Sequence, residues 1–256
     1  MDTIKSVVLK IKRQAAPQSA PYWEEFEVPY KPRENVITCL MHIRRNPLNR
    51  EGKPTTAPAW EAACLEEVCG TCTMIVNGRV RQSCSALVDE VGKRVGDRIE
   101  ITLEPMTKFP VVRDLIVDRS EMFETLKRIR AWVPIDGTHD LGPGMRLRDD
   151  IRELRYEFSR CMTCGCCLEA CPNVNAHSNF IGPAALAQVK LFNLHPVGAS
   201  LEDNRFDVLA GPDGLTGCGN AQNCVQVCPK DIPLTRAIAE LNRDMLVNRL
   251  RKWLAK

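Results

Sequence analysis

The sequence predicts an α+β N-terminal domain followed by a mostly α-helical domain, and three patterns lead to this prediction. Apolar and polar residues alternate in several segments of the first hundred residues, as they do in half-buried strands. Apolar residues recur at three- and four-residue spacing in the last hundred, as they do in amphipathic helices. Closely spaced cysteines, which make up much of a total of 13, occur in both regions.

The predicted first domain covers residues 1–110 and is built mainly from strands. Val7, Leu9 and Ile11 mark one strand, and Phe26 and Val28 mark a second. The segment NVITCLMHIRRN predicts one short helix that packs across the sheet, and RIEITLEP predicts a last strand. Within TMIVNGRVRQ an Asn-Gly pair is flanked by strand-like residues, which is a strong signal for a hairpin. These elements together predict a small sheet covered by a helix.

A connector is predicted over residues 111–144, and the second domain over residues 145–256. The connector contains a helix-like run, DLIVDRSEMFETLKRIRAW, and then the Gly/Pro-rich IDGTHDLGPG. Three segments of the second domain have helical periodicity: RDDIRELRYEF, GPAALAQVKLFNL and PLTRAIAELNRDMLVNRLRKWL. The second domain is therefore expected to be all α.

Composition narrows the classes of protein to consider. The net charge is only +3, and no basic block is interleaved with aromatic residues, so nucleic acid is not expected as a partner. The first residues, MDTIKSVVLKIKRQ, do not form the apolar stretch of a secretory signal. No apolar run reaches the roughly 18 residues needed to cross a bilayer, so attachment to a membrane is expected to depend on a partner.

The high cysteine content indicates metal binding. Clustered cysteines in a reducing compartment bind metal more often than they form disulfides, and an odd total of 13 fits a complete disulfide framework poorly. The spacing of the cysteines then indicates which kind of metal centre to expect.

The first cysteine group has the spacing of a plant-type [2Fe–2S] site. Cys64, Cys69 and Cys72 form a C-x4-C-x2-C pattern, and Cys84 returns after the predicted hairpin to complete four thiolates. Gly70 would allow backbone amides to approach the cluster closely. The alternative is a zinc site, which normally uses paired hooks of closely spaced cysteines instead of this loop.

The second group has the spacing of a bacterial ferredoxin. In Cys161, Cys164, Cys167 and Cys171, followed by proline, the fourth cysteine serves the other cluster of a pair. A third group keeps this spacing at Cys218, Cys224 and Cys228 but has Ala221 where one thiolate belongs.

The crossover rule assigns these cysteines to two clusters. Cys161, Cys164, Cys167 and Cys228 are predicted to hold a [4Fe–4S] cluster. Cys171, Cys218 and Cys224 remain for the other cluster, and three thiolates favour [3Fe–4S]. A four-iron cluster with water or another ligand at the open position is the alternative.

The remaining cysteines and the histidines do not indicate a catalytic site. Cys39 and Cys166 lie outside both patterns and are expected to be packed thiols. The four histidines are scattered, although His177, six residues after Cys171, could line a proton or quinone route. No dinucleotide-binding glycine motif or P-loop is present, so flavin or nucleotide is expected to be held elsewhere. No catalytic residue is predicted.

The order and spacing of these groups resemble the iron–sulfur subunit family of succinate dehydrogenase (quinone) and fumarate reductase. The resemblance extends through FPVVRDLIVDRS, CMTCGCCLEACP, FIGPAALAQVKLF and CGNAQNCVQVCPKDIPLTRAI. It implies a β-grasp [2Fe–2S] ferredoxin domain that faces a flavoprotein with bound FAD, and an all-α ferredoxin-like domain on a membrane anchor. The implied electron path runs from FAD through the [2Fe–2S], [4Fe–4S] and [3Fe–4S] clusters to a quinone, as part of the tricarboxylic acid cycle and the respiratory chain.

Two departures bear on the quinone. Ubiquinone-using members carry tryptophans after the cysteine that corresponds to Cys171, where this sequence reads Asn173-Val174-Asn175-Ala176. Their histidine after the cysteine that corresponds to Cys218 is replaced by Gly219. In this respect the sequence resembles the menaquinone-linked enzymes, which implies a cytochrome b anchor subunit and a peripheral position on the cytoplasmic side of the membrane.

Two other functions remain open from the sequence. A fumarate reductase subunit would share every motif, because the direction of electron flow depends on the quinone and the flavin site. A soluble ferredoxin-like carrier would lack a membrane partner. The segment after Cys228 has seven basic and three acidic residues, which suits either a membrane-facing contact or a solvated helix.

Overall fold

The computed structural model describes residues 3–134 and 146–255, and the described chain forms two compact units. The first unit comprises Met1–Arg119 together with Met162–Glu169, and the second comprises Ser120–Cys161 together with Ala170–Lys256. The Gly/Pro-rich part of the predicted connector, residues 135–144, lies outside the described residues. The short segment Met162–Glu169, which carries part of the second cysteine run, therefore belongs to the same unit as the first cysteine group.

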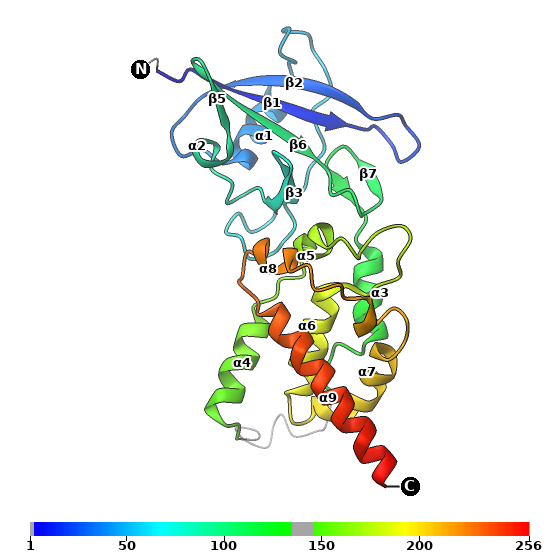
Figure 1. The fold of residues 1–256 in the computed structure, drawn as a ribbon. Helices are drawn as coiled ribbons and strands as arrows, with labels where there is room; N and C mark the ends of the chain where they lie inside the picture. Colours follow the sequence, from blue (N-terminus) through cyan, green and yellow to red (C-terminus); the bar gives the residue numbers. More distant parts are fainter. Residues whose placement is uncertain (1–2, 135–145, 256) are drawn as a thin grey trace. The chain divides into compact units, whose positions relative to one another are not determined.

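The first unit is built around a mixed sheet, shown in blue to green in Figure 1. In the part of the chain that the structure describes, the sheet has six strands in the order β2-β1-β6-β3-β4, with β5 paired to β6. The central β1–β6 pair is parallel, and the other pairs are antiparallel. A separate two-stranded ribbon joins β7 and β8. The strands of this unit are β1 Ser6–Arg13, β2 Tyr22–Pro29, β3 Thr73–Val76, β4 Arg79–Gln82, β5 Lys93–Val95, β6 Arg98–Glu104, β7 Val111–Arg113 and β8 Ile116–Val117.

The predicted strands and the predicted short helix of this unit are confirmed. Val7, Leu9 and Ile11 of β1 are fully buried, and they pack in one core with Leu40 and Ile43 of α1 (Val36–Arg45). Asn35 caps α1, because its side chain accepts a hydrogen bond from the Thr38 N–H at 2.9 Å. Helix α1 thus covers one face of the sheet, as its apolar stripe requires. The unit also contains α2 Val88–Val91 and α5 Cys166–Ala170, the last residue of which belongs to the second unit.

The prediction of a helix-like run through Asp114–Trp132 was wrong at its start. The helix α3 (Ser120–Arg128) begins six residues later, and the preceding residues form the β7–β8 ribbon. Asp114 has a left-handed φ of +47°, and its buried carboxylate accepts hydrogen bonds from Arg13 Nε at 3.0 Å and from the Ala59 N–H at 2.8 Å. These long-range bonds hold a turn that outweighs the local helical periodicity.

The second unit is helical, as predicted. Helix α6 (Gly182–Asn193) is its central element and is buried along most of its length. It packs against α9 (Leu234–Leu254), and the buried Lys190 on α6 forms ion pairs with Glu240 and Asp244 of α9 at 2.9 and 2.7 Å. The other helices of this unit are α3, α4 Asp149–Ser159, η1 Gly198–Leu201, α7 Glu202–Leu209, η2 Leu215–Gly217 and α8 Asn223–Gln226.

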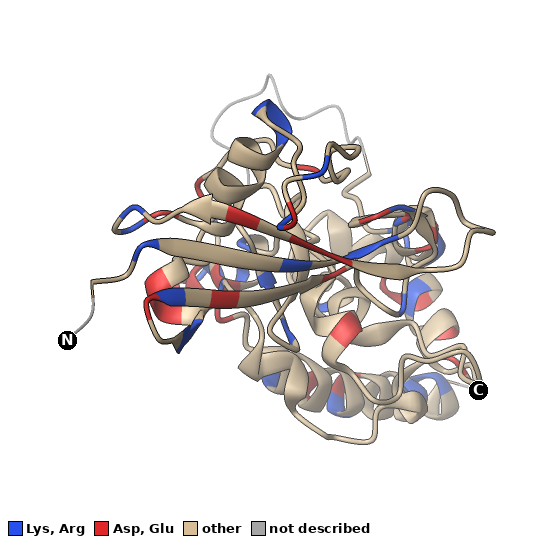
Figure 2. Cartoon of the chain, turned by 90° about the horizontal axis from the view of Figure 1, so that it is seen from above, with Lys and Arg blue, Asp and Glu red and all other residues tan. Residues whose placement is uncertain are grey.

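Charge is mixed over the described surface. Figure 2 shows basic and acidic residues interspersed along the strands of the first unit, in keeping with the small net charge of +3. Among the described residues, no helix combines the length and the apolar character needed to span a membrane.

Candidate iron–sulfur centres

The first cysteine group lies at one end of the β3–β4 hairpin. Cys72 immediately precedes β3, and Cys84 follows β4 by two residues. The turn between the strands is the predicted Asn77-Gly78 pair, whose φ angles of +49° and +76° are those of a tight hairpin turn. The hairpin returns the chain so that the Ser83 N–H donates to the Cys72 carbonyl at 3.2 Å. The predicted hairpin thereby brings Cys72 and Cys84 together.

The backbone between Cys64 and Cys69 turns its N–H groups toward sulfur. The N–H groups of Glu66, Val68 and Cys69 donate to Cys64 Sγ at 3.4, 3.3 and 3.3 Å. Leu65 and Glu67 adopt left-handed φ angles of +59° and +55°, although neither is glycine. Left-handed residues alternating with ordinary ones form a concave nest of N–H groups that binds anions, including iron–sulfur clusters. Non-glycine residues held in this conformation point to a functional constraint on the loop.

The four thiols form two pairs with different surroundings. Burial disfavours the Cys69 thiolate, but hydrogen bonds from the Thr71 side chain and from backbone N–H groups outweigh this effect and lower the pKa of Cys69 to about 6. Cys64 and Cys69 are partly exposed and interact with each other. Cys72 and Cys84 are buried and also interact, and burial raises the pKa of Cys72 to about 12.

Two pairs of thiols suit a two-iron cluster, in which two cysteines bind each iron. Among the described side chains, no group of three or more His, Cys, Asp or Glu surrounds a single metal ion. The backbone nest and the paired thiols together fit an anionic cluster.

The first cysteine loop packs tightly against the second. Gly70 has φ +73°, and a Cβ atom at this position would lie only 2.8 Å from both Cα and Cβ of Cys164. Arg119 fixes the same loop, because its guanidinium donates to the carbonyls of Gly70 and Thr71 at 2.8 Å each. The absence of a Cβ atom at Gly70 thus allows close packing against Cys164, while the approach of backbone amides to a cluster at Gly70 stays a prediction.

Replacing Gly70 with alanine is expected to disturb both loops, and Gly78→Ala is a matched control. Both glycines have φ near +75°, but a Cβ atom at Gly78 would meet nothing within 4 Å. Gly78→Ala should lower the free energy of unfolding by about 1 kcal/mol from backbone strain alone. Gly70→Ala should cost about 1–3 kcal/mol more from overpacking and should lower the visible cluster absorbance. If denaturant titrations show the same loss of unfolding free energy in both variants, the close packing of Gly70 is contradicted.

The second and third runs repeat the backbone pattern of the first. Thr163 and Gly165 have φ of +53° and +88°, and Asn220 and Gln222 have φ of +54° and +61°. In these two runs the left-handed residues stand two and four positions after the first cysteine, and in the first run they stand one and three positions after it. The repeated cysteine spacing therefore corresponds to a repeated nest of N–H groups.

The cysteines predicted for the [4Fe–4S] cluster are divided between the units. Cys164 and Cys167 belong to the first unit, and Cys161 and Cys228 belong to the second. A hydrogen bond from Cys166 lowers the pKa of Cys164 to about 7 in spite of burial. The assignment of all four cysteines to one cluster stays a prediction from their spacing.

The three cysteines predicted for the [3Fe–4S] cluster all lie in the second unit. Burial raises the pKa of Cys224, and the charges of Cys171 and Cys218 raise it further. The three thiols therefore lie close enough to affect one another's charge. Ala221, where the spacing would place a fourth thiol, is exposed.

The two remaining cysteines are packed as expected. Cys39 is fully buried in the core of the first unit, and burial raises its pKa to about 12. Cys166 is only 1% exposed and accepts a hydrogen bond from Gln82 Nε2 at 3.4 Å.

Sequence reasoning did not single out Gln82, Thr71 or Arg119 as parts of the cysteine sites. Thr71 could have been found from its place between two ligands. No local signal marks the bond from Gln82 to Cys166 or the bond from Arg119 to Gly70, because these partners lie 84 and 49 residues away.

The structure brings together the two positions that depart from the ubiquinone-type sequences. Asn173 Nδ2 donates to the carbonyl of Gly217 at 2.6 Å. A Cβ atom at Gly219 would lie 3.1 Å from the side-chain amide of Asn173. His177 lies on an exposed turn, where its N–H donates to Asn175 Oδ1 at 2.9 Å.

A sheet domain with a four-cysteine loop, followed by a helical domain with two ferredoxin runs, defines a multicluster iron–sulfur electron carrier. Residues 8–124 match the family described as a 2Fe-2S iron-sulfur cluster binding domain, and residues 157–232 match the 4Fe-4S dicluster domain. The chain is 54% identical over 253 residues to the succinate dehydrogenase iron-sulfur subunit of Bacillus subtilis, covering 99% of this chain and 98% of that protein.

Two more distant proteins are similar over most of their length. The fumarate reductase iron-sulfur subunit of Wolinella succinogenes is 29% identical, with 90% of this chain and 93% of that protein covered. A chain of the Mycobacterium smegmatis Sdh1 complex in the apo form has the same fold, with a TM-score of 0.80, 23% identity and coverage of 97% and 98%. The chain belongs to the family of succinate dehydrogenase and fumarate reductase iron–sulfur subunits.

Proposed function

We propose that this chain conducts electrons from the FAD of a flavoprotein subunit to menaquinone at a membrane anchor subunit, in the direction of succinate oxidation. The observation that carries the proposal is the order of three cysteine sets along a chain that is 54% identical to a succinate dehydrogenase subunit. Each cluster, when bound, accepts and releases one electron at a time. Separate one-electron carriers are what a two-electron flavin donor requires.

The proposed ligand sets follow the spacing and the nests. Cys64, Cys69, Cys72 and Cys84 would hold [2Fe–2S], and Cys161, Cys164, Cys167 and Cys228 would hold [4Fe–4S]. Cys171, Cys218 and Cys224 would hold [3Fe–4S]. The packing of Gly70 against Cys164 supports a short path between the first two clusters. No side chain of this chain is assigned to the chemistry of succinate itself.

Menaquinone is favoured over ubiquinone because of Asn173 and Gly219. These neighbouring positions present a small amide and no side chain, where the ubiquinone-type sequences carry tryptophan and histidine. The usual polar and aromatic contacts to ubiquinone on this subunit are therefore missing. The anchor, which we take to be a cytochrome b subunit, would supply the quinone site and hold this chain on the cytoplasmic side of the membrane.

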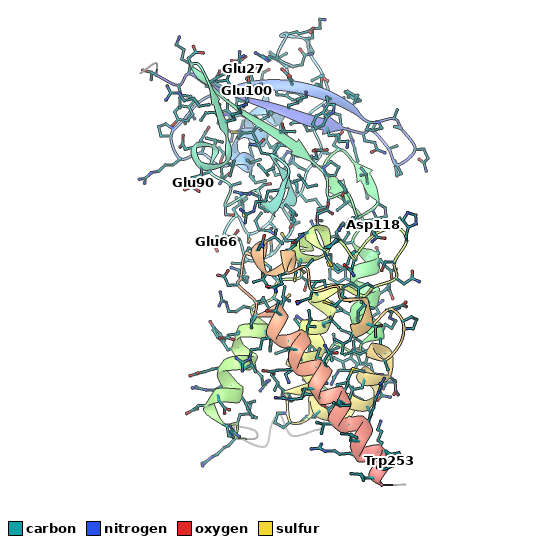
Figure 3. The ribbon with its side chains drawn as sticks, viewed as in Figure 1. Glu27, Glu66, Glu90, Glu100, Asp118 and Trp253 are labelled. Atoms are coloured by element: carbon teal, nitrogen blue, oxygen red, sulfur yellow. The ribbon has the colours of Figure 1, made fainter. Side chains whose placement is uncertain are left out.

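The end of α9 offers a surface for the membrane-facing partner. Leu250 and Trp253 are 52% and 72% exposed, and Trp253 projects from the last turn in Figure 3. Arg249, Arg251 and Lys252 lie around them, and no acidic residue follows Asp244. An exposed apolar surface with basic neighbours is suited to a membrane-embedded partner.

Replacing both Leu250 and Trp253 with glutamate is expected to release the chain from membranes. Each apolar side chain contributes about 1.5 kcal/mol or more when buried, so losing both should lower association roughly a hundredfold. The control is Tyr156→Glu on α4, which changes an aromatic residue that is 68% exposed. Immunoblots of membrane and supernatant fractions measure the effect. Equal retention of the double variant and the control would rule out this surface.

The function is tested by capturing the chain from gently solubilised membranes. A FAD-bearing subunit and a haem-bearing anchor should be captured with it, and the complex should reduce a menaquinone analogue faster than a ubiquinone analogue when given succinate. Capture of the chain alone, without succinate activity, would instead favour a soluble ferredoxin-like carrier. Faster fumarate reduction than succinate oxidation would favour the reverse direction, as in the relative from W. succinogenes.

A further inference from the structure

Gln82 occupies a fully buried position between the first and second cysteine runs. It is the last residue of β4, directly paired with Thr73 at the start of β3. Its side chain contacts Cys72 on one side and Cys166 on the other, and all of these residues belong to the first unit. Gln82 and Cys166 are 0% and 1% exposed, so water cannot screen the amide dipole.

Thr73 sets which end of the amide faces which cysteine. The Thr73 hydroxyl has one proton, which it donates to the Gly70 carbonyl at 2.7 Å. Thr73 Oγ1 lies 2.9 Å from Gln82 Nε2 and 3.1 Å from Gln82 Oε1. Because its single proton is donated to Gly70, the Thr73 oxygen can only accept, so the hydrogen bond is the one donated by Nε2. The second proton of Nε2 is directed to Cys166 Sγ at 3.4 Å, and Oε1 is left facing Cys72 Sγ at 3.7 Å.

The proposed cluster ligands fix the remaining protons. As ligands, Cys72 and Cys164 are thiolates and have no proton to donate. Cys166 is not among the proposed ligands and remains a thiol, and its side chain contacts that of Cys164, so its S–H is the donor available to the Cys164 sulfur. Gln82 therefore donates a hydrogen bond to Cys166, which in turn donates to the ligand Cys164. The carbonyl oxygen of Gln82 faces the other ligand, Cys72.

We propose that Gln82 is a positioning residue whose oriented amide, acting with Cys166, raises the reduction potential of the second cluster and lowers that of the first. Reduction adds negative charge to a cluster, so a donor chain directed at a ligand sulfur favours it and a carbonyl oxygen beside one opposes it. The effect favours transfer from the first cluster to the second. This inference rests on the proposed assignment of Cys72 and Cys164 as ligands.

The transfer that Gln82 biases involves one electron and no proton. One electron leaves the first cluster, which is oxidised, and enters the second, which is reduced. The proposed flavin donor replaces the electron, and the proposed third cluster accepts it onward. Gln82, Thr73 and Cys166 keep their hydrogen bonds throughout, because each proton is already held by a buried partner.

The test compares four variants of the complete complex by redox titration followed by EPR. Gln82→Leu removes the dipole and keeps the size of the side chain. Cys166→Ala removes the S–H donor, and Cys166→Ser restores a donor. Gln18→Leu makes the same chemical change as the first variant at an exposed turn of the same unit.

Gln82→Leu is expected to raise the potential of the first cluster and lower that of the second. The equilibrium constant for transfer between them should fall about tenfold, equivalent to ~59 mV for one electron. Cys166→Ala should lower only the second potential, Cys166→Ser should return it toward the wild-type value, and Gln18→Leu should change neither. Unchanged potentials in Gln82→Leu, or shifts of the opposite sign, would overturn the proposal.

The titration separates this inference from the proposed function. If wild-type complex shows no [2Fe–2S] and [4Fe–4S] signals, the ligand assignment fails and the role of Gln82 fails with it. If both signals are present and Gln82→Leu leaves both potentials unchanged, only the role of Gln82 is wrong. If Gln82→Leu does not assemble, the Cys166 pair decides: a lower second potential in Cys166→Ala that serine restores supports the proposal, and equal potentials in both overturn it.

Discussion

Replacing Cys72 with alanine is expected to abolish the [2Fe–2S] EPR signal and to reduce succinate-dependent quinone reduction to background. Cys72 is buried at the base of the β3–β4 hairpin beside Cys84, and its loss would leave three thiolates for a cluster that requires four. Because the proposed electron path has a single entry cluster, no route around the gap is available. EPR of the dithionite-reduced complex and a quinone reduction assay measure the two effects.

The control for this prediction is Cys39→Ala. Cys39 is also a buried cysteine of the first unit, but it lies in the core behind α1. Its replacement should cost about 1 kcal/mol of stability from lost packing and should leave the signal intact. A [2Fe–2S] signal that survives in Cys72→Ala, or one that disappears in Cys39→Ala, would show that the ligand assignment is wrong.

Replacing Ala221 with cysteine is expected to convert the proposed three-iron cluster to a four-iron cluster. The change restores the full ferredoxin spacing in the run that holds Cys218, Cys224 and Cys228. A fourth thiolate adds negative charge next to the cluster, so the reduction potential of the cluster should fall. Each ~59 mV of this fall makes the equilibrium constant for electron transfer to the cluster about tenfold less favourable. The [3Fe–4S] signal of the oxidised complex should disappear, and quinone reduction should slow.

Ala221→Ser is the matched control for this conversion. A serine hydroxyl has nearly the size of the thiol but is not a thiolate ligand, so the three-iron signal and the rate should stay close to those of the wild type. Persistence of the three-iron signal in Ala221→Cys would mean that position 221 does not face the cluster. Full activity in a variant that has a four-iron cluster would mean that the third cluster does not limit transfer to the quinone.

Local patterns were sufficient to predict most of the elements. The alternation around Leu9, the Asn77-Gly78 turn and the apolar stripes of α1 and α9 depend on neighbours within a few residues, so they can be read from the chain. The run that starts at Asp114 could not be read in this way. Its carboxylate is held by Arg13, which lies 101 residues away, and this contact breaks the predicted helix.

The grouping of the cysteines is a prediction of a different kind. Iron–sulfur loops require fixed spacings, so the sequence itself predicts which cysteines share a cluster, including Cys171 with Cys218 and Cys224, and this grouping stays a prediction. What surrounds the cysteines was not predictable. The packing of Gly70 on Cys164 and the bonds made by Gln82 and Arg119 connect segments that are distant in sequence, and no periodicity or spacing marks them.

EPR of the complex captured from native membranes through this chain, before and after addition of succinate, tests the central claim most directly. We expect a three-iron signal in the oxidised complex that succinate removes, a [2Fe–2S] signal that succinate generates, and a [4Fe–4S] signal on full reduction. A menaquinone analogue should reverse the succinate-induced changes. A colourless, iron-free chain, or clusters that succinate cannot reduce, would contradict the account of this chain as the electron path between flavin and quinone.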